Sequence, residues 1–155
     1  MITKEALTFI TFFLAITGYC GLTIAILFSL QEKIPIQFWR IVSAIILLHV
    51  IMVWSFHYEG NFFTAVRNGY SGFIIFHSAL LMIIVSNFVK RKLAILLVRI
   101  SFIIVSIGAV GAVFRYDVVA VYKLPVIFFV LLVVVSVIRK YYLKSKLIKT
   151  KTGST

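Results

Sequence analysis

The chain has 155 residues, of which 63% are hydrophobic and only 13% are charged, and its formal net charge is +12. A soluble domain carries about 25% charged residues, and one of this size could not cover so much apolar surface, so the composition predicts an all-α integral membrane protein. Lysine and arginine gather in short segments between long apolar runs, as membrane topology requires. We therefore expect the lipid bilayer, and no nucleic acid, as the partner of this charge.

Five apolar runs are long enough to cross a bilayer, which takes about 20 mostly apolar residues in a helix. The sequence predicts a transmembrane helical bundle over residues 1–142 and a basic tail over residues 143–155. The five helices are expected at about 6–30, 36–56, 70–89, 93–114 and 124–142. The charged-ended stretch RYDVVAVYK, residues 115–123, is interpreted as an interfacial connection or as an extension of the last helix. Four crossings are the alternative to five.

The distribution of basic residues predicts the orientation, because cytoplasmic segments are enriched in lysine and arginine. With five helices, one side of the membrane carries most of them, in the loop at 31–40, the turn at 90–92 and the tail. These residues are Lys33, Arg40, Lys90, Arg91, Lys92, Arg139, Lys140, Lys144, Lys146, Lys149 and Lys151. We expect the N-terminus outside and the C-terminus in the cytoplasm, in the inner membrane of a bacterial-type cell. Arg99, inside the fourth run, is within reach of the cytoplasmic surface by snorkelling.

Glycines mark close approaches between helices. Gly18 and Gly21 belong to a stripe of small residues in the first helix, and Gly108 and Gly111 lie in the fourth. Small residues let membrane helices pack closely, which is one interpretation of all four. Gly108 and Gly111 could instead leave room for a flat cofactor.

Two histidines are predicted to share one depth in the membrane. His49 lies seven residues before the end of the second helix, and His77 lies seven residues inside the third. At a rise of about 1.5 Å per residue both lie about 10 Å below the outer surface. Gly108 and Gly111 fall in the same layer.

A b-type haem requires such a pair, with one imidazole on each side of the ring and iron between them. Its propionates would point outward, where Arg67 and Arg115 could pair with them. A histidine inside a membrane can equally bond to a neighbouring helix or relay protons, and these alternatives remain open. A metal ion bound by His49 and His77, with His57 as a third candidate ligand, is a further alternative.

The pair His49 and His77 beside these glycines resembles the small b-type cytochrome subunits of respiratory membrane complexes. That resemblance implies haem b, and with it a quinone, bound to a subunit of a larger membrane complex. With three histidines in the chain, one such haem at most is expected. The segments FHYEG and FHS are also similar to those of small membrane proteins that assist the assembly of respiratory oxidases.

The first function expected is therefore a one-haem cytochrome or redox-complex subunit that passes electrons between quinol and an outer-side partner. The second is a non-catalytic accessory or assembly subunit of a larger respiratory membrane complex, with structural histidines. A small transporter is the third. No nucleophile–base pair or carboxylate pair is apparent in the sequence, so an enzyme acting alone is not expected.

Overall fold

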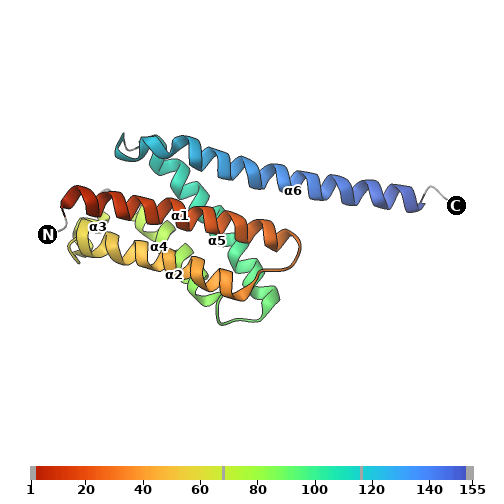
Figure 1. Cartoon of the computed structure of the whole chain (residues 1–155), viewed down its shortest axis with the longest axis horizontal. Helices are drawn as coiled ribbons and strands as arrows, with labels where there is room; N and C mark the ends of the chain where they lie inside the picture. Colours follow the sequence, from red (N-terminus) through yellow and green to blue (C-terminus); the bar gives the residue numbers. More distant parts are fainter. Residues whose placement is uncertain (1–2, 68, 116, 153–155) are drawn as a thin grey trace.

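The computed structural model describes residues 3–67, 69–115 and 117–152, and these residues form helices joined by short loops and turns (Figure 1). Two of the elements are not α-helices: η1 is a π-helical turn and η2 is a 3₁₀ helix. In chain order the elements are α1 (Lys4–Leu30), α2 (Ile36–Met52), η1 (Val53–His57), α3 (Phe62–Val66), α4 (Tyr70–Val85), α5 (Arg91–Arg115), η2 (Asp117–Tyr122) and α6 (Lys123–Thr152).

Among the residues that the structure describes, four helical segments are long and apolar enough to cross a membrane, which agrees with the membrane class expected from composition. They are Glu5–Leu30, Ile36–His57, Arg91–Arg115 and Val119–Lys146. The helix α4 is also apolar but has 16 residues, so it is about 24 Å long against a hydrocarbon core of about 30 Å.

The helix predicted at 70–89 ends at Val85 because polar side chains take over its last carbonyls. The Ser86 hydroxyl and the Asn87 amide both donate to the Ile83 carbonyl oxygen, at 2.7 and 2.8 Å. Short-range side-chain bonds of this kind compete with the helical ladder, and the backbone turns over the next residues. The chain then enters α5 at Arg91.

The last helix is longer than predicted. The segment expected to be an interfacial connection forms η2, which leads directly into α6, and α6 continues to Thr152 rather than ending near residue 142. No glycine or proline occurs between Pro125 and Thr152, and leucine and lysine are good helix formers, so nothing stops the helix earlier. Figure 1 shows the C-terminal part of α6 projecting beyond the other helices.

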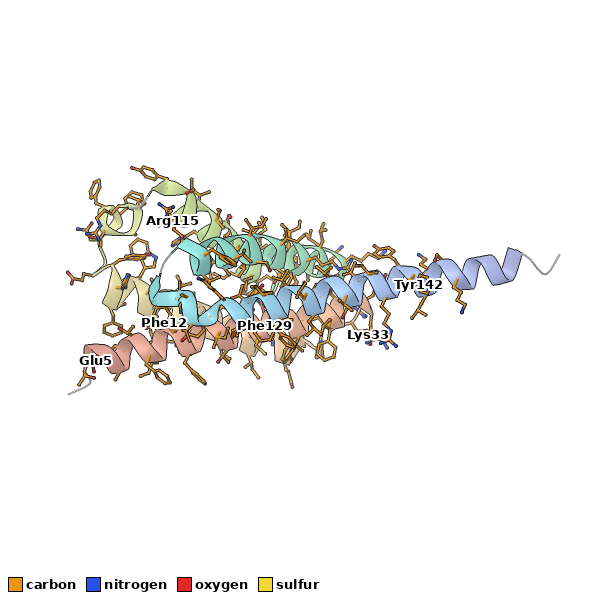
Figure 2. The ribbon with its side chains drawn as sticks, turned by 90° about the horizontal axis from the view of Figure 1, so that it is seen from above. Glu5, Phe12, Lys33, Arg115, Phe129 and Tyr142 are labelled. Atoms are coloured by element: carbon orange, nitrogen blue, oxygen red, sulfur yellow. The ribbon has the colours of Figure 1, made fainter. Side chains whose placement is uncertain are left out.

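The core lies where α1 meets α2, α5 and α6. Tyr19 is buried there, with its ring stacked on Phe102 of α5 and edge-on to Phe129 of α6. Its hydroxyl shares a 2.8 Å hydrogen bond with Ser106 of α5. In Figure 2, Phe129 and Phe12 lie along the region where α1 and α6 run side by side. One tyrosine thus joins three helices.

The glycines of α1 pack as the small-residue stripe predicts. A Cβ at Gly21 would lie 2.7 Å from Val42 Cγ2 of α2, and one at Gly18 would lie 2.8 Å from Ile46 Cγ1. Both distances are too short for a real side chain, so α1 and α2 approach this closely only because these positions are glycine.

The bundle has two ends of different character. The basic end consists of the α1–α2 loop (31–35) and the α4–α5 turn (86–90), which lie close together because Trp39 Nε1 donates to Ser86 Oγ at 2.8 Å. The loop end consists of residues 58–67, residue 69 and the C-terminal end of α5 at Arg115. Figure 2 shows Lys33 and Arg115 at these opposite ends.

Candidate functional site

His49 binds its neighbouring helix. It lies half-buried on α2, and its Nδ1 is 2.9 Å from the backbone carbonyl oxygen of Thr11 on α1. A carbonyl oxygen can only accept, so Nδ1 donates and carries the proton of the neutral ring. Nε2 is then the acceptor nitrogen. The ring therefore joins the C-terminal part of α2 to the N-terminal half of α1.

His77 is held from two directions. Its Nδ1 donates to the Phe73 carbonyl oxygen at 2.8 Å, one turn back on α4, so it has the same tautomer as His49. Its Nε2 accepts from the indole N–H of Trp54 at 3.0 Å. The Phe73 ring also stacks on the imidazole, with 3.9 Å between ring centroids. The lone pair that would bind a metal is engaged by Trp54.

Trp54 lies in η1, where the helix widens by one residue. The Tyr58 N–H bonds to the Val53 carbonyl oxygen five residues back, at 3.0 Å, rather than to the one four back. Such π turns change which way the following side chains face, and they are frequent at functional sites. No residue pattern predicts this turn, and therefore none predicts the Trp54–His77 bond.

His57 ends η1 and is exposed, with its ring 5.3 Å from that of Tyr58. Among the residues that the structure describes, no group of three or more histidine, cysteine, aspartate or glutamate side chains is placed to hold a metal ion. The metal site predicted on His49, His77 and His57 has no geometric support in this part of the chain.

The two glycines predicted beside the histidines differ in their surroundings. A Cβ at Gly108 would lie 2.8 Å from Phe76 Cζ and 3.1 Å from Ile75 Cγ2, both on α4, whereas one at Gly111 would have nothing within 4 Å. Side chains of α4 therefore cover Gly108, which serves helix packing. At Gly108 these side chains occupy the room that a flat ring would need, whereas the space beside Gly111 is open.

The predicted propionate partners lie at the loop end. Arg67 follows α3 and Arg115 is the last residue of α5, and both are exposed. Nearby, the Lys123 ammonium lies 5.4 Å from the centre of the Phe114 ring. Exposed basic side chains at this end of the bundle are consistent with a position where the bilayer meets water.

A haem between His49 and His77 fits this layer only in part. Both rings keep Nε2 as the acceptor, and both anchor Nδ1 on a backbone carbonyl, as metal-bound histidines do. Against this, Trp54 occupies Nε2 of His77, and Phe76 with Ile75 covers Gly108. The described arrangement accommodates the ring only in part, and the haem assignment stays a prediction.

A second cluster, which the sequence analysis missed, closes the C-terminal end of α1. Arg99 of α5 donates from Nε to Ser29 Oγ at 3.1 Å and from Nη2 to the Ser29 carbonyl oxygen. Arg91 donates to the Glu32 carbonyl oxygen, and Lys140 of α6 donates to that of Leu30. Three cations thus meet the negative end of the α1 dipole. The presence of Arg99 inside an apolar run could have predicted this cluster, because charged residues within membrane helices usually pair with groups of the protein.

No family model, curated protein or solved structure matches this chain. Its class therefore follows from the fold: a helical protein whose described part contains four helices long and apolar enough to cross a membrane.

Proposed function

We propose that this chain is a non-catalytic accessory or assembly subunit of a larger membrane complex, and that its buried histidines are structural. One observation carries the proposal: His49 and His77 each use one ring nitrogen in a hydrogen bond that joins two elements of the bundle. His49 joins α2 to α1, and His77 joins α4 to η1. Hydrogen bonds between membrane helices contribute about 0.6 kcal/mol on average and up to about 1.7 kcal/mol.

We infer five crossings, with α4 as the third. The support is connectivity: α2 starts beside Ser86 at the basic end, and α5 starts beside Glu32 at that same end. Since α2 ends at the loop end, α4 has to carry the chain back across the same thickness. Arg91, Arg99 and Lys140 all act at the basic end, which supports a cytoplasmic location for it, an outside N-terminus and a bacterial-type inner membrane.

A groove between α2 and the end of α4 is where a partner helix would pack. Its volume is about 350 Å³, and it is lined by Arg40, Ser43, Ala44, Leu47, Ile84, Asn87 and Phe88.

Asn87 supplies the reason to expect a partner in this groove. Its Nδ2 donates to Ser43 Oγ at 3.0 Å and to the Ile83 carbonyl oxygen, which fixes the orientation of the amide. Its Oδ1 is buried and accepts no hydrogen bond from the described residues. A buried acceptor left without a donor costs about 1–3 kcal/mol. A polar group from a neighbouring membrane helix would remove that cost.

The test is purification of the tagged full chain from its native membrane in mild detergent, followed by native gel electrophoresis. We expect one or more large partners at fixed stoichiometry. Ala44→Trp, which fills the groove from an exposed position, should abolish the association. Leu131→Trp on the exposed side of α6 is the control and should retain it. A chain that migrates alone, or that loses its partner equally in both variants, contradicts the proposal.

A one-haem b-type cytochrome is the second candidate, favoured by the shared tautomer of the two histidines. Haem, when bound, would supply one-electron transfer, and a quinone would be the natural donor. The chain's own part would be to present Nε2 of His49 and His77, each with Nδ1–H anchored on a carbonyl. A reduced-minus-oxidised spectrum of protein made with added haem decides this: b-type bands that vanish in both His49→Ala and His77→Ala would support it, and a spectrum without bands would exclude it.

A further inference from the structure

A cleft at the basic end brings four cationic side chains close together. Its volume is about 500 Å³, and it lies between the α1–α2 loop and the start of α5. It is lined by the cations Lys33, Arg91, Lys92 and Arg99, together with Gln31 and Glu32, and Ile95 contributes an apolar wall.

The four cations outnumber the acidic side chains that line the cleft. No ion pair joins any of them to a carboxylate among the described residues, and Glu32 is the one acidic side chain that lines the cleft. A guanidinium has five N–H donors. Arg99 uses two of its nitrogens on Ser29, and Arg91 uses one on the Glu32 carbonyl oxygen, so N–H groups remain on both arginines for a ligand. Arginine forks and lysine ammoniums together suit the oxygens of a phosphate.

The cleft opens onto an apolar helix face. At 100° per residue, Leu96 and Ile103 lie on the same face of α5 as Lys92 and Arg99. Leu96 is 51% exposed and Ile103 is 57% exposed. A ligand with a phosphate head and a hydrocarbon tail matches a basic cleft beside an apolar face. A free phosphate would contact only the cleft and leave the apolar face without a ligand.

We propose that this cleft binds the headgroup of an anionic phospholipid, with the phosphate between Lys33, Lys92 and the two arginines and an acyl chain along the Leu96 face. Basic pockets beside transmembrane helices recognise such headgroups, and each lysine or arginine near the anionic surface strengthens binding roughly fivefold. This inference does not depend on the proposed function, since it concerns the opposite end of α5 from the histidine layer.

The test uses the full chain in neutral detergent and native mass spectrometry with two probes, phosphatidylglycerol and phosphatidylcholine of the same acyl chains. We expect phosphatidylglycerol to bind at least tenfold more tightly. The double variant Lys33→Gln/Lys92→Gln removes two exposed cations of the cleft and should weaken it by roughly 25-fold, from about fivefold for each charge. The matched control, Arg139→Gln/Lys144→Gln on the exposed part of α6, removes the same charge and should change affinity less than threefold.

A variant that is expected to gain binding keeps the test decisive even if the double variant misfolds. Glu32→Gln removes the one negative side chain of the cleft and should tighten phosphatidylglycerol binding several-fold. Equal losses in the double variant and its control would overturn the proposal, since binding would then reflect overall charge. Equal affinity for phosphatidylcholine would overturn it as well. So would full displacement of the lipid by millimolar inorganic phosphate, which would identify a site for the soluble anion.

Discussion

The indole N–H of Trp54 donates to Nε2 of His77 over 3.0 Å, and this bond joins the π turn at the end of α2 to the middle of α4. It takes the ring nitrogen that a metal would need. The contact between these two residues therefore determines whether His77 can act as a metal ligand or only as a structural residue. Whichever role His77 has, Trp54 controls access to its lone pair.

Trp54→Phe should lower stability by about 0.5–1.5 kcal/mol, because the aromatic surface stays and the hydrogen bond is lost. Unfolding by SDS in mixed micelles, followed by circular dichroism, measures this. Combined with His77→Phe, the two substitutions should cost less together than the sum of their separate effects, because they remove one shared bond.

The same variant separates the two candidate functions. If His77 is a haem ligand, freeing its Nε2 in Trp54→Phe should raise haem occupancy in the visible spectrum. If it is structural, the spectrum stays without haem bands while stability falls. A Trp54→Phe protein as stable as the parent would show that this hydrogen bond contributes nothing.

The apolar runs were sufficient to predict the membrane class and the approximate helices, because a membrane helix needs a continuous apolar segment and few charges. The depth of His49 and His77 also follows from counting residues along each helix. What counting cannot give is which neighbouring element each side chain faces. That direction depends on the π turn at Val53–His57 and on the neighbour that each ring meets, Thr11 or Trp54. For the same reason the sequence could not tell that Phe76 covers Gly108.

Gly21→Ala should be among the most damaging single substitutions in α1. Its methyl group would meet Val42, a buried and branched side chain on α2, at 2.7 Å, so the two helices would have to separate. Overpacking of this kind costs about 1–3 kcal/mol. SDS unfolding of the purified variant measures the loss.

Gly111→Ala is the matched control, because nothing lies within 4 Å of the added methyl group. Alanine is the better helix former by up to about 1 kcal/mol, so this variant should be as stable as the parent or more so. Equal effects at Gly21 and Gly111 would contradict the close packing of α1 on α2.

Glu32→Gly should stabilise the turn after α1. Glu32 has φ of 57°, and the Lys33 N–H reaches the Phe28 carbonyl oxygen at 3.2 Å, the pattern of a helix terminus that glycine normally occupies. Replacing a side chain in this left-handed conformation by glycine relieves about 1 kcal/mol of strain. Glu32→Ala keeps the Cβ and removes the same charge, so its stability should rise less than that of Glu32→Gly.

Arg99→Met should loosen the C-terminal end of α1. Ser29 is fully buried, and the guanidinium of Arg99 bonds both its hydroxyl and its carbonyl oxygen. Methionine keeps much of the apolar stem and removes both charge-assisted bonds, so we expect a loss of about 1–3 kcal/mol. Arg99→Lys keeps the charge at the end of the helix dipole but cannot present two parallel donors, so its loss of stability should be intermediate.

Arg139→Met, at an exposed position on α6, is the control and should stay within about 0.5 kcal/mol of the parent in the same SDS titration. If Arg99→Met and Arg139→Met unfold at the same SDS fraction, Arg99 interacts with the bilayer surface, as its position in the sequence first suggested, and does not hold α5 to α1.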